Sequence, residues 1–364
     1  MRKVTLGEVC SRGSSNIAQK DLNGNNGKYP IYGASGLIKC VDFYHQGKEY
    51  VAVVKDGAGI GRTMLLPANS SVIGTMQYLI PNEDVDVRYL YYAVLNMNLS
   101  KYFSGATIPH IYFRDYQDEE FMLPSMSEQG EKADNLQKIE RLITVKQTEL
   151  TKLNDLVKSR FVEMFGDPIR NPRGWEVTTI GDIVTDVRYG TSKPAVKGGK
   201  YPYLRMNNLT FDGRLDLTDL KYIDIPDEEL EKSVVRKGDV LFNRTNSVEL
   251  VGKTATFDFN QEMVIAGYII RVRLNERMLP EVFSQYMNLE ALKTLLRDMA
   301  KGAVNQANIN AQELQSIKVY VPDIDSQKRF VDIKVQTDKS KLAVQKELEK
   351  LEILKKSLMQ QYFG

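Results

Sequence analysis

Short polar loops that follow apolar stretches carry the side chains best suited to chemistry in this sequence. The densest is residues 243–247, Asn-Arg-Thr-Asn-Ser, which comes directly after the strand-like residues 239–242. Arg and Lys donate hydrogen bonds to phosphate oxygens and to guanine, and Asn and Gln pair with adenine through two hydrogen bonds. The chemistry indicated is recognition of nucleic acid, although each loop also has the composition of an ordinary surface loop.

Similar loops in both halves of the chain supply the other candidates. In the first half the candidate DNA-contacting residues are Arg12, Ser14, Asn16, Lys55, Arg62, Thr107 and His110. In the second half they are Tyr189, Thr191, Ser192, Lys193, Arg205, Asn207, Asn243, Arg244, Thr245, Asn246, Lys253, Asn305, Gln306 and Asn308. The loops 107–111 and 305–309 occupy matching places before long helical segments. Contact with DNA and packing of a globular part against a helix explain these two loops equally well.

No catalytic residue, metal site or cofactor is predicted from the sequence. Two cysteines and two histidines are too few for a four-cysteine zinc site or a histidine-based metal cage. The glycines of residues 57–61 resemble a dinucleotide-binding loop, but Arg62 takes the place of the third glycine, so a turn between strands explains them better. An ATP-binding Gly-x-x-x-x-Gly-Lys-Ser/Thr loop is absent, and residues 171–173, Asn-Pro-Arg, only approach the Asn-Pro-Pro-aromatic motif of methyltransferases.

Length and composition indicate a multidomain globular protein. The chain has 364 residues, and 49 Lys and Arg against 47 Asp and Glu give a net charge of +2. At about 100–200 residues per domain, this length predicts two or three domains. A nucleic-acid surface must then arise from the local arrangement of charge. No apolar run reaches the roughly 18 residues of a membrane span, and the N-terminus lacks a signal-peptide core, so we expect a cytoplasmic protein without a membrane partner.

The elements that would position the polar loops form an internal repeat. Residues 6–9, Leu-Gly-Glu-Val, recur as residues 180–183, Ile-Gly-Asp-Ile, at an offset of 174. The last segment of each half recurs at a constant offset of 198, as shown by the pairs Pro124 and Pro322, Gln129 and Gln327, and Phe165 and Phe363. Each half therefore has a front of variable length and a back of fixed length.

The backs of both halves are predicted to be long helices that pair in a coiled coil. Residues 125–165 contain no proline and one glycine, and apolar residues recur there at a heptad spacing, as they do in the second back. The predicted seam consists of Leu136, Ile139, Ile143, Leu150, Leu153, Val157, Val344, Leu348, Leu351 and Leu358. Helices this polar are only marginally stable alone, so each is the expected partner of the other. The alternative is that each helix packs on its own domain.

The fronts have the pattern of mixed α and β structure. Residues 50–54, 239–242 and 264–274 are predicted strands, and residues 88–98 and 281–297 are predicted helical. The predicted fold is α+β, with two globular mixed α/β domains joined by two long antiparallel coiled-coil helices in a pseudo-twofold internal repeat. The expected domains are a first recognition domain, 1–125; a central repeat helix, 126–166; a second recognition domain, 167–323; and a C-terminal repeat helix, 324–364.

Four pieces of the sequence follow one another in an order that is more specific than any single motif. They are residues 238–246 with Val251-Gly252-Lys253; their first-half counterpart, residues 53–62; the proline-to-glutamine entries into the helices at 124–129 and 322–327; and the junction 164–168 with Gly174-Trp175. In this order they resemble the specificity subunits of type I restriction-modification systems. The resemblance covers essentially the whole chain, with one departure: the first front has about 125 residues against about 155 in the second.

This resemblance implies that the protein reads double-stranded DNA and has no catalytic activity of its own. Each front would be a target-recognition domain for one half of a bipartite target, and the helices would set the spacing between the halves. The helices would also dock two methyltransferase (M) subunits, through which restriction (R) subunits join. The alternative is a non-enzymatic coiled-coil scaffold with two protein-binding heads. Its partner interactions would be insensitive to salt, whereas DNA affinity falls steeply with salt.

Overall fold

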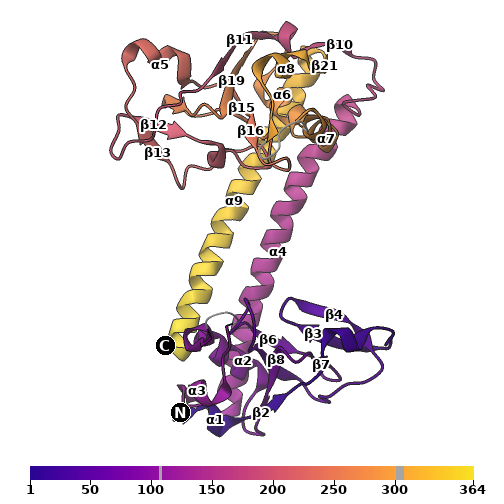
Figure 1. The fold of residues 1–364 in the computed structure, drawn as a ribbon, viewed down its shortest axis with the longest axis vertical. Coiled ribbons are helices and arrows are strands. Elements are labelled where there is room, and N and C mark those ends of the chain that lie inside the picture. The colour runs from indigo at the N-terminus through magenta and orange to yellow at the C-terminus, as the bar shows by residue number, and fades with distance from the viewer. Residues whose placement is uncertain (106–108, 301–306) are drawn as a thin grey trace. The chain divides into compact units, whose positions relative to one another are not determined.

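The computed structural model describes residues 1–105, 109–300 and 307–364 and contains two compact units (Figure 1). The first unit comprises residues 1–147 and 346–364, and the second comprises residues 148–345. Two helices, α4 (Met126–Phe165) and α9 (Ile324–Phe363), each contribute one segment to the first unit and one segment to the second. The two units therefore share their long helices.

The first unit contains two β-sheets and helix α2 (Val87–Asn96). One sheet is antiparallel, with the strand order β2 (Cys10–Ser14), β8 (Met76–Pro81), β5 (Tyr50–Val54) and β6 (Thr63–Leu66). The other has the order β4 (Gly36–Val41), β3 (Tyr29–Gly33) and β7 (Ser71–Val72), with β3 parallel to β7. The remaining elements are the strand pair β1 (Arg2–Thr5) and β9 (Glu120–Leu123), and the short helices α1 (Leu6–Val9), η1 (Gln19–Leu22), η2 (Leu99–Tyr102) and α3 (Phe113–Tyr116).

Strand β5 lies in the centre of this unit, which explains its unbroken apolar sequence. Val51 and Val53 belong to the core cluster that includes residues of α2, whereas Tyr50, Ala52 and Val54 belong to a different cluster. Successive side chains of a strand point to opposite faces, so a strand covered on both faces needs apolar residues at every position.

The second unit repeats this plan with additions. Its antiparallel sheet has the order β11 (Val184–Tyr189), β19 (Ile269–Leu274), β15 (Val240–Asn243) and β17 (Thr254–Thr256). Its second sheet has the order β13 (Lys221–Ile223), β12 (Tyr201–Leu204), β18 (Met263–Ile265) and β14 (Val234–Val235), with β12 parallel to β18. The other strand pairs are β10 (Glu176–Thr179) with β21 (Lys318–Val321) and β16 (Thr245–Asn246) with β20 (Ala307–Asn308). The helices are η3 (Ile180–Ile183), η4 (Met206–Asn208), α5 (Asp227–Ser233), α6 (Pro280–Met287), α7 (Glu290–Met299) and α8 (Ala311–Ser316).

The matching strand orders confirm the predicted internal repeat and the α+β class. The four-stranded antiparallel sheets correspond strand for strand, and the parallel pair β3–β7 corresponds to β12–β18. Residues 34–35 join β3 to β4, whereas residues 205–220 join β12 to β13, and α5 and β14 follow β13 in the second unit. The greater length of the second front lies mainly in these two segments.

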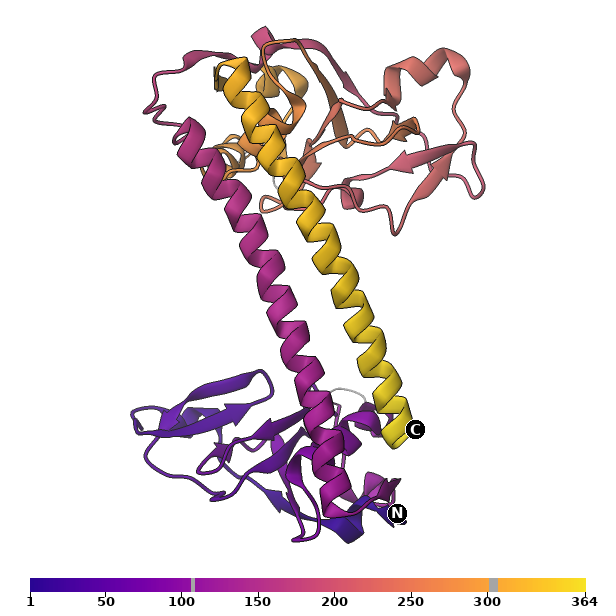
Figure 2. The same ribbon diagram turned by 180° about the vertical axis from the view of Figure 1, so that it is seen from behind.

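Within each unit, the segments of α4 and α9 lie side by side and antiparallel (Figure 2). In the first unit, Lys146 pairs with Glu347 at 2.6 Å and Glu140 pairs with Lys355 at 2.7 Å. A residue earlier in α4 thus pairs with a residue later in α9, as expected for antiparallel helices. In the second unit, the rings of Phe161 and Phe165 near the end of α4 contact Phe330 near the start of α9, with centroids 5.2 and 5.7 Å apart.

The predicted seam positions all point at least partly away from solvent. Leu136, Ile139, Val157, Val344 and Leu348 are buried, and Ile143, Leu150, Leu153, Leu351 and Leu358 are half-buried. Partial exposure is expected in a pair of helices, because a seam residue is covered by its own helix and one partner only.

Two predicted elements are each divided in the structure. The strand predicted over 264–274 is two strands, β18 and β19, in different sheets, because a turn at Gly267 bonds Ile269 N to Ala266 O at 2.8 Å. The helix predicted over 281–297 is two helices, α6 and α7. Asn288 ends α6 by donating its side-chain amide to Thr254 O at 2.6 Å and to Ser284 O at 2.8 Å.

A buried glutamine fixes the start of each long helix to its unit. Gln129 Nε2 donates to the carbonyls of Asp84 and Pro124, both at 3.0 Å, and its Oε1 accepts from Asp86 N at 2.8 Å. Gln327 makes the same three bonds in the second unit, to the carbonyls of Arg277 and Pro322 and from the amide of Leu279, all at 2.8 Å. This explains why the glutamine follows the proline by five residues in both halves.

Replacing either glutamine by alanine is expected to destabilise its own unit by about 1–3 kcal/mol. The substitution leaves one buried and two partly buried backbone groups without this partner, and such groups cost more than the bonds themselves contribute. Denaturant unfolding measures the loss, and hydrogen exchange at Asp86 N or Leu279 N identifies the unit. Gln336→Ala, at an exposed position of α9, is the matched control. Equal stability of Gln327→Ala and Gln336→Ala would contradict this role.

Candidate nucleic-acid interface

A cavity of about 470 Å³ in the second unit brings together polar loops that are distant in sequence. Its walls come from the loop after β11, the residues after β12, the β15–β16 junction and the β18–β19 turn. Six of the predicted residues line it: Thr191, Ser192, Lys193, Arg205, Asn207 and Arg244. The remaining lining residues are Pro194, Ala195, Tyr203, Met206, Ala266, Gly267 and Tyr268.

Tyr203 and the β18–β19 turn hold the walls of this cavity in place. Tyr203 Oη lies 3.1 Å from the carbonyl of Thr191 and 3.0 Å from that of Lys193. Gly267 N donates to Thr191 O at 2.8 Å. The loop after β11 is therefore hydrogen-bonded to both neighbouring segments, so its polar side chains project from a braced backbone.

Two of the three cations that line the cavity are paired with carboxylates. Lys193 lies 2.9 Å from Glu229, and Arg205 lies 2.7 Å from Asp219. Arg244 instead lies over the ring of Tyr189, with its guanidinium carbon 4.8 Å from the ring centroid, and donates weakly to Gly267 O at 3.4 Å. Among the described residues no carboxylate pairs with Arg244, so it is the cation of this cavity whose charge is left uncompensated.

Other predicted residues of the second unit brace the loop from within. Asn243 is buried, and its amide donates to the carbonyls of Thr245 and Tyr268. Thr245 Oγ1 donates to Asn308 Oδ1 at 2.8 Å, and Asn246 Nδ2 donates to Asn243 Oδ1 at the same distance. These bonds leave Asn243 and Thr245 little access to an external partner, while Asn308 is exposed.

Lys253 is also inside the unit. Its ammonium group donates to Met206 O at 2.9 Å, and burial lowers the pKa of this group below its ordinary value. The positive charge is thus used to hold η4 beside the cavity. Asn305 and Gln306 lie outside the described residues.

In the first unit three of the predicted residues, Lys55, Arg62 and His110, lie around Asp56. His110 Nδ1 lies 2.6 Å from Asp56 Oδ1, and Lys55 Nζ lies 4.0 Å from the same carboxyl group. Arg62 is exposed and donates to Ala34 O at 2.6 Å, beside a cavity of about 510 Å³ that Asp56 also lines. Arg12, Ser14 and Asn16 are exposed on and after β2, and none of them lines this cavity. Thr107 lies outside the described residues.

Backbone hydrogen bonds align the two units residue by residue. Ile111 N donates to Lys55 O and Ile309 N donates to Arg244 O, both at 2.9 Å. Gly61 N donates to Val54 O, and Gly252 N donates to Asn243 O, also at 2.9 Å. Lys55 therefore occupies the position of Arg244, so the two units present different chemistry at one structural position.

Sequence reasoning missed two residues of these sites, Asp56 and Tyr268. Asp56 follows a predicted strand directly beside Lys55, which was the available signal. Tyr268 was placed inside a continuous strand, although Gly267 before it indicates a turn. In the structure Tyr268 is half exposed at the cavity.

The described parts of the chain contain neither a cluster of three or more His, Cys, Asp or Glu placed to hold a metal nor a helix long and apolar enough to cross a bilayer.

The chain contains two α+β units of matching strand order, each with polar loops at its strand ends, and the units share a pair of helices. This arrangement defines a protein with duplicated recognition domains. The family model described as type I restriction modification DNA specificity domain matches residues 1–155 and 172–353, and the chain belongs to this family. The resemblance found in the sequence is thus confirmed.

Two solved structures share the fold along nearly the whole chain. The S subunit of a type I restriction-modification system from M. genitalium has a TM-score of 0.65 and 17% identity, covering 100% of this chain and 96% of its own. A chain from a structure describing complex assembly and conformational transition of the type I R-M system has a TM-score of 0.58 and 17% identity, with 99% and 97% covered. At this identity both support the fold alone.

Curated relatives match over shorter stretches. The type I restriction enzyme EcoKI specificity subunit of Escherichia coli K12 is 28% identical over 153 residues, 41% of this chain and 33% of that protein. The MjaVIII specificity subunit of Methanocaldococcus jannaschii is 25% identical over 214 residues, 57% and 45% of the two chains. The matches thus span less than half the length of these relatives.

Proposed function

We propose that this protein is the sequence-specific DNA-binding specificity subunit of a type I restriction-modification complex. Each recognition domain reads one half of a bipartite target in double-stranded DNA, and the subunit has no catalytic role of its own. One observation carries the proposal: the same fold occurs twice with different donor side chains at corresponding positions, Lys55 and Arg244. Two domains that share one fold but present different donor side chains suit a target with two unlike halves.

The paired helices have a second role in this proposal. They set the spacing between the two halves of the target and dock two methyltransferase subunits, through which restriction subunits join. Exposed apolar side chains support a docking role: Leu142 and Val145 on α4 in the first unit, and Val335 and Leu342 on α9 in the second. Apolar residues on an exposed helix surface favour a protein partner. As part of this proposal, we expect the complex to act on DNA in the cytoplasm.

Methylation mapping tests this function directly. A cell that expresses the protein with its methyltransferase partner is expected to carry one methylated bipartite motif, which is absent when the gene for this protein is deleted. The reason is that the partner supplies the chemistry and this protein supplies the sequence. Single-molecule sequencing of genomic DNA reports both outcomes. An active methyltransferase whose motif is unchanged by the deletion would contradict the proposal.

Salt dependence separates this function from a protein-binding scaffold. Binding of the complex to its motif should weaken by on the order of a thousandfold between about 50 and 200 mM salt if six or more phosphates are contacted. The affinity is measured by fluorescence anisotropy with a labelled duplex, with a duplex of shuffled sequence as the control. Binding that is weak at every salt concentration, together with a salt-insensitive protein partner, would favour the scaffold.

A further inference from the structure

The cavity of the second recognition domain contains a guanidinium group that is held in place and left free to bind. The Arg244 backbone is fixed at both sides, because its N–H donates to Tyr268 O at 3.0 Å and its carbonyl accepts from Ile309 N at 2.9 Å. Its guanidinium lies over the ring of Tyr189 at 4.8 Å, and that ring is itself anchored by a 2.8 Å bond from Ala311 N to Tyr189 Oη. Stacking on an aromatic face orients the planar group without using its hydrogen-bond donors.

Within the part of the chain that the structure describes, the donors of Arg244 are almost unused. An arginine has five N–H donors, and here one of them makes a single weak bond, to Gly267 O at 3.4 Å. Its Nε is buried without a partner, so the terminal nitrogens are the atoms available to a ligand. Arg205 and Lys193 in the same cavity are already bonded to Asp219 and Glu229.

We infer that Arg244 reads a guanine in the half of the target bound by the second recognition domain. This inference rests on the proposed function and names the base read at this site. A planar fork of two N–H donors matches the O6 and N7 acceptors of guanine, and arginine is the side chain that makes this contact most often. Pro194, Ala195 and Met206 also line the cavity, and their side chains offer a phosphate neither charge nor a hydrogen bond.

The first domain offers different chemistry at the corresponding position. Lys55 lies 4.0 Å from Asp56, and Asp56 is bonded to His110. A lysine beside a carboxylate lacks the planar fork, and its charge is partly compensated. At this structural position the guanine contact is therefore assigned to the second domain.

The test is methylation by the complete complex of this protein with its methyltransferase partner on a randomised library of duplexes. For the wild type, the half-site read by the second domain should contain a guanine at one fixed position. Arg244→Gln should lower discrimination at that base pair about ten- to hundredfold and leave the other positions unchanged. Arg244→Lys keeps the charge but loses the fork, so it should relax the same position and serves as a second variant if Arg244→Gln is unstable. Circular dichroism melting reports whether each variant folds.

Lys55→Gln is the matched control, since it removes a charge from the corresponding position of the first domain and should leave this guanine preference intact. Uniform loss of methylation with unchanged preference in both Arg244 variants would mean a phosphate contact and overturn the inference. An unaltered motif at full activity would overturn it too. A wild-type complex that methylates without any bipartite motif would instead refute the proposed function.

Discussion

Lengthening α4 and α9 by four residues each, after Gln147 and after Gln345, will lengthen the spacer of the methylated motif by about one or two base pairs. Four helical residues add about 6 Å along a helix axis, and base pairs follow one another at about 3.4 Å. The insertion makes slightly more than one turn, since a turn takes about 3.6 residues, so the apolar faces of the helices stay nearly in phase.

The change should also abolish methylation of the motif with the original spacer. Two linked recognition sites bind together only when the linker matches the distance between their targets, and the combined affinity is lost when it does not. Methylation mapping in cells that carry the lengthened protein reports the new spacer, while the half-site sequences should be unchanged. Adding the same residues after Gly364, beyond the end of α9, is the control for the change in composition. If the original spacer persists in the lengthened protein, the helices do not set it.

The architecture was predictable because its signals are long-range and periodic. A heptad pattern over some forty residues, repeated at a constant offset, leaves little choice but two paired helices. Short elements depend on single turns, and here the prediction over 264–274 was wrong. Its apolar residues continue through Gly267, so hydrophobicity alone could not reveal that the two strands belong to different sheets.

The candidate site was predictable in place rather than in residue roles. Asn243 and Arg244 are neighbours in one polar cluster, yet Asn243 is buried and braces the loop while Arg244 lines the cavity. Backbone groups that leave a sheet need partners, and Asn and Thr side chains supply them locally. A dense group of donors therefore serves two purposes at once, and the distinction depends on which side chain faces inward, which the strand register decides.

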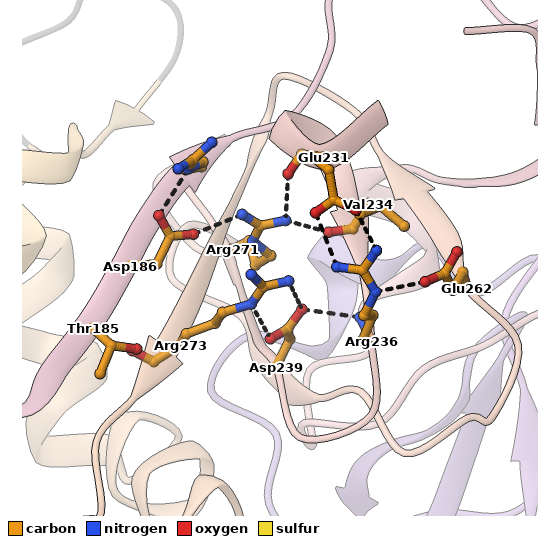
Figure 3. Close-up of polar contacts among 10 residues, drawn as sticks. Thr185, Asp186, Glu231, Val234, Arg236, Asp239, Glu262, Arg271 and Arg273 are labelled. Atoms are coloured by element: carbon orange, nitrogen blue, oxygen red, sulfur yellow. Dashed lines mark hydrogen bonds and ion pairs between the residues drawn. The ribbon is translucent and has the colours of Figure 1, made fainter. Parts of the chain in front are cut away.

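A buried arginine in the second unit links the α5–β14 segment to the sheet (Figure 3). Arg271, on β19, is fully buried and donates to the Asp186 carboxylate at 2.6 Å. It also donates to the carbonyls of Glu231 in α5, at 3.2 Å, and of Val234 in β14. This segment has no counterpart in the first unit, so the arginine connects an addition of the second recognition domain to the shared fold.

Two further arginines, Arg273 and Arg236, form ion pairs beside this link between the α5–β14 segment and the sheet. Arg273 donates to Asp239 at 2.9 Å, and Arg236 bridges Glu231 and Glu262, both at 2.5 Å (Figure 3). The ion pairs of Arg236 with Glu231 and Glu262 are exposed, so each contributes little on its own. Asp239 is buried and also accepts from Arg236 N at 2.9 Å. Arg271 is the fully buried arginine of the network.

Arg271→Met is expected to lower the free energy of unfolding of the second unit by about 3–5 kcal/mol. The substitution fills similar space but removes one of the two arginine donors of the partly buried Asp186 carboxylate, which keeps Arg188. It also removes the Arg271 donor of two carbonyl groups. Denaturant unfolding measures the loss, and hydrogen exchange of β14 and β19 assigns it to this segment. Arg214→Met, which breaks an exposed pair with Asp212, is the matched control and should cost less than about 1 kcal/mol.

The deficit of Arg271→Met should shrink in acid, and this dependence distinguishes a lost ion pair from lost packing. Burial raises the pKa of Asp186, but hydrogen bonds from Arg271 and Arg188 outweigh it and hold the pKa below its ordinary value of 3.8. A carboxyl group with a lowered pKa stabilises the fold above its ordinary pKa, and this contribution is lost as the pH falls through the folded-state pKa. The convergence of the two proteins should begin only below the ordinary pKa of 3.8, so unfolding is measured at a series of pH values from neutral to about 2. A deficit that stays constant over this range would mean that Arg271 stabilises the domain through packing and its carbonyl contacts rather than through Asp186.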